Sequence, residues 1–104
     1  MQYKDFENCG LKITLDMISG KWTPPILYFL FSNRDIRFNT LWRSIPKISK
    51  KVLTEHLKKL ESVGLISKRE VNSFPIEVHY SLSEKGKSLG TILSDLDNFG
   101  SEHS

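Results

Sequence analysis

The chain has 104 residues, of which 38% are hydrophobic and 26% are charged, and its formal net charge is +3. This composition is typical of one modest globular domain spanning 1–104, and the single cysteine excludes an intrachain disulfide and a cysteine-based zinc site. No apolar run approaches the roughly 20 residues that cross a bilayer, and the N-terminus lacks the apolar segment of a secretory signal, so we expect a cytoplasmic protein with no membrane partner.

Residues 1–10 are expected to form an N-terminal arm that leads into a helix from about Leu11 to Ile18. Within that helix, Leu11 and Leu15 recur at the spacing of one apolar face, and Gly20 ends the pattern. The start of the chain is therefore predicted to carry a short amphipathic helix.

A second helix is predicted to begin at the two prolines Pro24 and Pro25, which are tolerated in a first helical turn. Thr23 is its expected N-cap, because threonine is among the residues that prefer this position. The stretch Ile26–Phe31 is apolar almost all round. We expect this helix to be the buried centre of the domain.

The stretch Arg37–Arg69 is the most informative part of the sequence, since it reads as helix, tight turn, helix and strand. The first of these helices has an apolar face that includes Phe38 and Leu41. Pro46 ends it, because proline has no N–H to donate and disfavours helical angles in the residue before it. A joint of three residues between two helices is typical of a helix-turn-helix.

The second helix of this pair has clear start and stop signals. Ser49 is the expected N-cap, Leu53, Leu57 and Leu60 form one apolar stripe, and Gly64 follows as the stop. The remaining positions of this helix are mostly donors. One face is therefore predicted to pack, while the opposite face offers positive charge.

Positive charge is concentrated in this region. Residues 47–69 carry seven Lys or Arg against two Asp or Glu, whereas 70–104 carry two against six. Such a basic block is the expected footprint of phosphate contact. By itself it also suits an ordinary helical hairpin with a solvated lysine face.

After Gly64 the hydrophobic period changes to two, which predicts strands over 65–71 and 77–82. The turn residues and proline of Asn72–Pro75 separate them. In a DNA-binding helix-turn-helix, the second helix is the recognition helix, and a β-hairpin directly after it is called a wing. The predicted hairpin therefore favours a winged helix-turn-helix over a plain helical hairpin.

A final helix is predicted over 84–100, with Ser83 as its N-cap. Its apolar residues recur three and four positions apart as one stripe. The stripe consists of Leu89, Ile92, Leu93, Leu96 and Phe99. It either folds back on its own core or contacts a second copy of the chain. We interpret it as a dimer contact, because a DNA reader of this kind needs two half-sites.

Several separated runs resemble the HxlR-type family of regulators, in the same order and spacing. The runs are Gly20-Lys21-Trp22, Ile26-Leu27 and Arg37–Leu41 (family pattern GKW…IL…RFNEL), Ile45–Thr54 (IPGIS-x-x-VL-T), Leu57–Ile66 (LRELEEDGLI), and Pro75 with Val78–Leu89 (P-x-x-VEYSLTE-x-G-x-SL). The resemblance covers about Cys9 to Gly100. It implies a bacterial or archaeal winged helix-turn-helix transcription regulator, dimeric through its N- and C-terminal helices, so Leu11 and Leu15 join the dimer candidates. The predicted fold class is α+β and mainly helical.

The resemblance also draws attention to Cys9. Many family members respond to oxidants, quinones or aldehydes, several of them through a cysteine just ahead of the first helix. Here Gly10 replaces the usual proline after it, and the second cysteine that some members use is missing. This leaves a bridge between the Cys9 residues of two copies, or an oxidant or electrophile adduct at Cys9. From the residues alone, the helix start and nearby Lys12 favour a reactive thiolate, and a small buried hydrophobe is the alternative.

We predict a sequence-specific DNA-binding regulator, a repressor, that binds a palindromic operator as a homodimer. The predicted DNA contacts are Ser49, Lys50, Lys51, Thr54 and Lys58 on the recognition helix, Asn39, Thr40 and Arg43 on the helix before it, and Lys68 and Arg69 on the wing. The three histidines are not closely paired, so neither a metal nor another cofactor is expected.

The alternative is a winged-helix module that binds an acidic protein without thiol sensing, and the basic block 47–69 favours DNA over it. An enzyme is not supported, because the sequence has no nucleophile–base spacing, phosphate loop or metal cluster.

Overall fold

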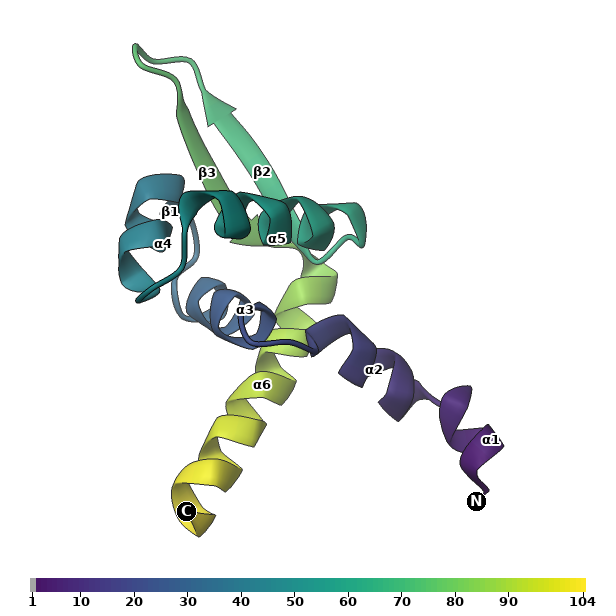
Figure 1. The fold of residues 1–104 in the computed structure, drawn as a ribbon. Helices are drawn as coiled ribbons and strands as arrows, with labels where there is room; N and C mark the ends of the chain where they lie inside the picture. Colours follow the sequence, from purple (N-terminus) through teal and green to yellow (C-terminus); the bar gives the residue numbers. More distant parts are fainter. Residues whose placement is uncertain (1) are drawn as a thin grey trace.

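The computed structural model describes residues 2–104, and Met1, at the tip of the expected arm, lies outside them. The elements are α1 (Tyr3–Glu7), α2 (Gly10–Ile18), α3 (Thr23–Ser32), β1 (Ile36–Arg37), α4 (Phe38–Ser44), α5 (Lys50–Ser62), β2 (Ile66–Val71), β3 (Glu77–Leu82) and α6 (Glu84–His103). The strands form one antiparallel sheet of order β1-β3-β2, and helices surround its base (Figure 1). The prediction of a mainly helical winged helix-turn-helix is confirmed.

Helix α3 lies at the centre of the core, as its apolar sequence predicted. Ile26, Leu27 and Leu30 are at most 1% exposed. They belong to a cluster completed by Ile36, Leu41, Ile45, Ile48, Leu53, Leu57, Leu60, Leu65, Ile66, Tyr80, Leu82, Leu89 and Leu93. Burying each such side chain contributes about 1.5–3 kcal/mol. The cluster joins α4, α5 and the sheet into one body around α3.

The expected N-cap of α3 is wrong by one residue. Trp22 precedes the helix with near-helical angles, and Thr23 is its first residue, 4% exposed. The two prolines explain the difference, because Pro25 has no N–H for a Thr23 cap to accept from. The next N–H, that of Ile26, already donates to the Trp22 carbonyl at 3.1 Å.

The ends of α5 follow the sequence signals. The Ser49 hydroxyl accepts a hydrogen bond from the Val52 amide at 3.1 Å, as an N-cap does. Gly64 has a φ of 80°, a left-handed conformation that suits glycine at a helix stop. The chain then turns directly into β2. Ser83 caps α6 in the same way, accepting from the Gly86 amide at 3.1 Å.

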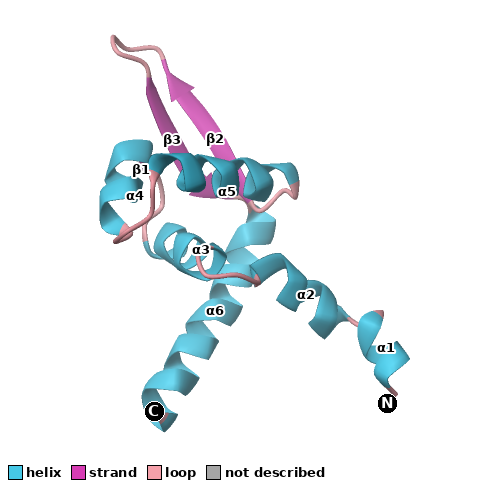
Figure 2. Ribbon diagram, viewed as in Figure 1, coloured by secondary structure: helices cyan, strands magenta, loops and turns pink. Residues whose placement is uncertain are grey.

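The hairpin of β2 and β3 projects beyond the helices as the predicted wing (Figure 2). Its register pairs Ile66 with Leu82 and Lys68 with Tyr80. Since successive side chains of a strand point to opposite faces, this register gives the sheet an inner face that meets the core and an outer face. Tyr80 lies on the inner face, whereas Arg69 lies on the outer face.

The N-terminal segment extends away from this body. The expected arm contains the short helix α1, and no residue of α1 or α2 is buried. In Figure 1 these two helices and the C-terminal part of α6 leave the body in different directions. The overall extents are 56 × 30 × 24 Å.

The apolar stripe of α6 divides between two surroundings. Leu89 and Leu93 are each 6% exposed and pack in the core of their own chain. Folding back is therefore the correct interpretation for these two residues. Ile92, Leu96 and Phe99 are 48%, 54% and 65% exposed, and only they remain free for a second copy.

A hydrogen bond attaches the outer part of α6 to α3. The Tyr28 hydroxyl donates to an Asp97 carboxylate oxygen at 2.9 Å. This bond to a carboxylate, together with desolvation, raises the pKa of Tyr28 above its ordinary value. The contact holds α6 in a defined direction as it leaves the body.

Candidate nucleic-acid interface

Trp42 holds the turn between α4 and α5. Its indole N–H donates to the Ile48 carbonyl at 2.9 Å, and the Lys50 ammonium lies 4.7 Å from the centroid of its ring. Lys47, in the middle of the turn, has a φ of 70°, which is unusual for a residue with a side chain. The angle between the two helices is thus set by a buried core on one side and by Trp42 on the other.

The N-terminus of α5 is suited to bind an anion. The free N–H groups of a first helical turn carry partial positive charge. Lys50 and Lys51 add two cations at this end, and both side chains are exposed. The Ser49 hydroxyl accepts the capping bond and keeps its proton as a donor.

The exposed face of α5 carries the other predicted contacts. Lys51 and Lys58 are exposed, and Thr54 beside them is half-buried. Their spacing of three, four and seven residues places them on one side of the helix. Glu55 is also exposed and shares this face. It was not among the predicted contacts, although a carboxylate can accept from a cytosine amino group.

A groove of about 350 Å³ lies between this helix pair and the wing. Thr54 of α5, Asn39 of α4 and Lys68 of β2 line it together, although they are distant in sequence. Arg37 also lines the groove and pairs with Glu77 at 3.1 Å. Sequence reasoning missed Arg37, whose signal was a cation directly before the first helix of the helix-turn-helix.

Arg69 lies apart from the other candidates. It follows Lys68 in the strand and therefore points to the outer face of the sheet. There it donates to an Asp35 carboxylate oxygen at 2.6 Å and lines a different pocket. Thr40 and Arg43 are exposed on α4 but do not line the groove that contains Asn39.

Cys9 lies at the N-cap position of α2 and is half-buried. The nearby cation expected to favour its thiolate is engaged elsewhere, since the Lys12 ammonium donates to Asp16 at 2.9 and 3.1 Å. That bond raises the pKa of Lys12. The start of α2, and not the Lys12 ammonium, therefore remains as the feature that favours a thiolate at Cys9.

The predicted N-terminal dimer candidates are exposed. Leu11 and Leu15 are 60% and 44% exposed, and Ile13, which the sequence analysis did not single out, is 52% exposed. Within residues 2–104, no helix combines the length and hydrophobicity needed to cross a membrane. The same residues contain no cluster of three or more His, Cys, Asp or Glu that could hold a metal ion.

The family model described as HxlR-like helix-turn-helix matches residues 17–104. This chain belongs to the HxlR family. It is 42% identical over 93 residues to the HTH-type transcriptional regulator YkvN of Bacillus subtilis strain 168, itself uncharacterised, a match that covers 89% of this chain and 78% of YkvN. The HxlR assignment makes the chain a transcriptional regulator that acts on DNA rather than an enzyme.

Solved structures of transcriptional regulators share the fold of this chain. A protein from Porphyromonas gingivalis W83, assigned to the MarR family of transcriptional regulators, superposes with a TM-score of 0.85 at 36% identity, over 94% of this chain and 95% of the other. The redox regulator HypR in its reduced form superposes with a TM-score of 0.84 at 32% identity, over 90% and 92%.

Proposed function

We propose that this HxlR-family chain is a homodimeric repressor that binds a palindromic operator and responds to oxidants or electrophiles through Cys9. The observation that carries the DNA part is the geometry of α5. A capped helix N-terminus, two lysines beside it and an exposed face with Lys58 lie next to the groove that contains Lys68. A helix presented in this way suits the major groove of a duplex.

Within this proposal, the contacts divide by chemistry. Lys51, Thr54 and Lys58 face base edges and the phosphates that border them, and the N-terminus of α5 with Ser49 binds a phosphate. Lys68 and Arg37 follow the backbone along the wing, with Asn39 beside them in the groove. Arg43 and Thr40 contact the backbone from α4. Arg69 supports the wing from the outer face instead.

The dimer follows from the apolar residues that the body leaves uncovered. Ile92, Leu96 and Phe99 on α6, and Leu11 and Leu15 on α2, are between 44% and 65% exposed. Pairing these surfaces in two copies would remove them from water and place two α5 helices for successive half-sites, about 34 Å apart along the duplex.

Cys9 is proposed as the sensor because of its place on the N-terminal arm. It lies at the N-cap position of the helix that carries Leu11 and Leu15, so a bridge or an adduct at its sulfur would act on the proposed dimer surface. A change in the dimer would alter the separation of the two α5 helices, so that they no longer match the spacing of the half-sites. The similarity to HypR, a redox regulator, supports this part of the proposal.

The test is duplex binding by fluorescence anisotropy, with fragments from upstream of the chain's own gene. Binding is measured at about 50 and 200 mM salt, because several phosphate contacts make affinity fall steeply over this range. The protein is used reduced, after diamide and after a quinone. Cys9→Ser is the matched control. We expect tight, salt-dependent binding that both treatments abolish. A thiol should restore it after diamide, which leaves a disulfide, but not after the quinone, which leaves a stable thioether. Neither treatment should change binding by Cys9→Ser.

The outcomes separate the parts of the proposal. Specific binding that is indifferent to both oxidants would retain the repressor and remove Cys9 as its sensor. No binding to any upstream duplex at either salt concentration would contradict the operator and favour a winged-helix module that contacts an acidic protein.

A further inference from the structure

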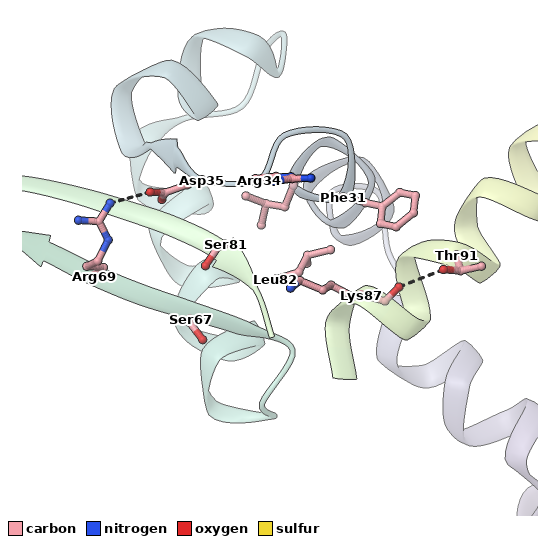
Figure 3. Close-up of a pocket in the computed structure, with 10 residues that line it drawn as sticks. Phe31, Arg34, Asp35, Ser67, Arg69, Ser81, Leu82, Lys87 and Thr91 are labelled. Atoms are coloured by element: carbon pink, nitrogen blue, oxygen red, sulfur yellow. Dashed lines mark hydrogen bonds and ion pairs between the residues drawn. The ribbon is translucent and has the colours of Figure 1, made fainter. Parts of the chain in front are cut away.

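A second pocket, of about 720 Å³, lies on the outer face of the sheet, opposite the groove at the recognition helix. Its walls are the end of α3, the outer side of β2 and β3, and the first turns of α6 (Figure 3). Pockets that hold small molecules have volumes of about 300–1,000 Å³. The DNA contacts proposed above use none of its residues.

The floor of this outer pocket is apolar and includes an aromatic ring. Leu30 and Leu82 are 1% and 7% exposed, while Phe31, which also lines the pocket, is 37% exposed. Gly90 of α6 lets the Phe31 ring lie directly on the helix, because a Cβ at position 90 would overlap the ring. The ring is thus held by its neighbour and still presents part of its surface to the pocket.

Cations surround this floor. Arg34 lies in the turn between α3 and β1, Arg69 in β2 and Lys87 in α6, and Asp35 is the only carboxylate that lines the pocket within residues 2–104. Asp35 pairs with Arg69 at 2.6 Å, and Lys87 pairs with the exposed Glu84 at 3.1 Å. Arg34 has no carboxylate within 4.0 Å among the described residues and remains available to a ligand.

Two hydroxyls complete the polar wall. Ser67 and Ser81 lie opposite each other in the β2–β3 register, and both side chains line the pocket. Neither hydroxyl makes a hydrogen bond within the part of the chain that the structure describes, whereas the Thr91 hydroxyl donates to the Lys87 carbonyl at 3.3 Å. The sheet therefore offers two free donors across from the apolar floor.

We propose that the outer pocket binds a small aromatic carboxylate. A carboxylate matches the planar fork of the Arg34 guanidinium and accepts from the two serine hydroxyls. An aryl ring stacks on the exposed part of Phe31, with the offset geometry that aromatic pairs favour. A single negative charge suits the site better than a phosphate dianion, because Asp35 and Glu84 already balance two of the three cations.

The test is calorimetric titration of the reduced full-length protein with 2-naphthoate in the absence of DNA. We expect a dissociation constant of about 1 mM or tighter. The neutral 2-naphthamide and the non-aromatic cyclohexanecarboxylate are expected to bind at least about tenfold more weakly, since one lacks the charge and the other the ring.

Two variants remove one positive charge each. Arg34→Gln is expected to weaken 2-naphthoate about tenfold, because it removes the free guanidinium. Lys59→Gln, at an exposed lysine of α5 outside the pocket, serves as the matched control and is expected to stay within about twofold. Both exchanges are at exposed positions, so circular dichroism should show folded protein.

Several results would overturn the proposal: no binding of 2-naphthoate at about 10 mM, equal binding of the amide, or equal effects of the two variants. A change in sedimentation caused by Arg34→Gln would also overturn it, because the pocket would then belong to an interface between copies. Since no DNA is present, failure here is distinguishable from failure of the proposed operator binding, which is measured separately on the same sample.

Discussion

The two parts of α6 show how one apolar stripe meets two different surroundings. Leu89 and Leu93, near its start, are each 6% exposed and pack in the core, whereas Leu96 and Phe99, further along, are 54% and 65% exposed. All four continue the same helical spacing. The inner part is held by residues of its own chain, and the outer part has an apolar face of the same kind without cover.

The same contrast separates the whole body from its extensions. The body contains every residue of the core cluster, so its stability is expected to come from one chain. Helices α1 and α2 bury no residue and are too short to be stable alone in water. Exposed apolar side chains on α2 and on the outer part of α6 form the surface at which we propose that a second copy binds. The following predictions test this division.

The largest expected effect on a single chain is that of Leu93→Ala. It should lower the free energy of unfolding by about 2–5 kcal/mol, because it leaves a cavity in the core. Leu96→Ala, one turn away, is the matched control and should change the stability of the protomer by about 0.5 kcal/mol or less. Urea denaturation at a high and a low protein concentration measures both. If both variants lost the same free energy of unfolding at the low protein concentration, Leu93 and Leu96 would not differ in their contribution to the core of the protomer.

The double substitution Ile92→Asp with Leu96→Asp should prevent dimerisation, because it places charge on the uncovered stripe. Sedimentation velocity is expected to show a monomer, and affinity for a two-half-site operator should fall by about 100-fold or more through loss of bivalency. Asn98→Asp adds charge to an exposed position on the other side of α6 and should leave the dimer intact. A double variant that remained dimeric would place the interface elsewhere.

The two faces of the wing offer a matched pair of adjacent cations. Lys68→Gln should lower the slope of log affinity against log salt by about 0.9, the value for one phosphate contact. Arg69→Gln removes the same charge from the outer face and should leave the slope unchanged. Anisotropy titrations at four salt concentrations measure the slopes. If the two variants gave the same slope, the face of the sheet on which a cation lies would not decide whether it contacts DNA.

The smallest expected effect is at Lys47 in the turn of the helix-turn-helix, where the family pattern has glycine. Lys47→Gly should raise the free energy of unfolding by about 0.5–1 kcal/mol, since it removes a left-handed strain of about 1–2 kcal/mol and adds chain entropy to the unfolded state. Lys47→Ala keeps the Cβ and should give no gain. Thermal unfolding by circular dichroism measures both, and a gain from alanine would contradict the strain argument.

Much of the interface could be predicted from local signals. Ser49, Gly64 and Ser83 mark the ends of α5 and α6 because capping bonds and left-handed turns involve neighbours in sequence. The prediction of Thr23 as the N-cap of α3 was wrong because the preference of threonine for that position requires a backbone N–H in the first turn, and proline has none. Arg37 was overlooked because its position in the groove depends on β3, a strand 40 residues later in the chain.

The sequence by itself determined the family, the order of helices and strands from α4 to α6, and the basic character of the region around α5, because periodicity, caps and motifs are read within one segment. Only the tertiary structure decided which strand face meets the helices, and hence that Lys68 and not Arg69 borders the groove. It likewise decided where the core stops along α6. Both outcomes depend on packing between segments far apart in the chain, and a local pattern shows only that an apolar face exists, not what covers it.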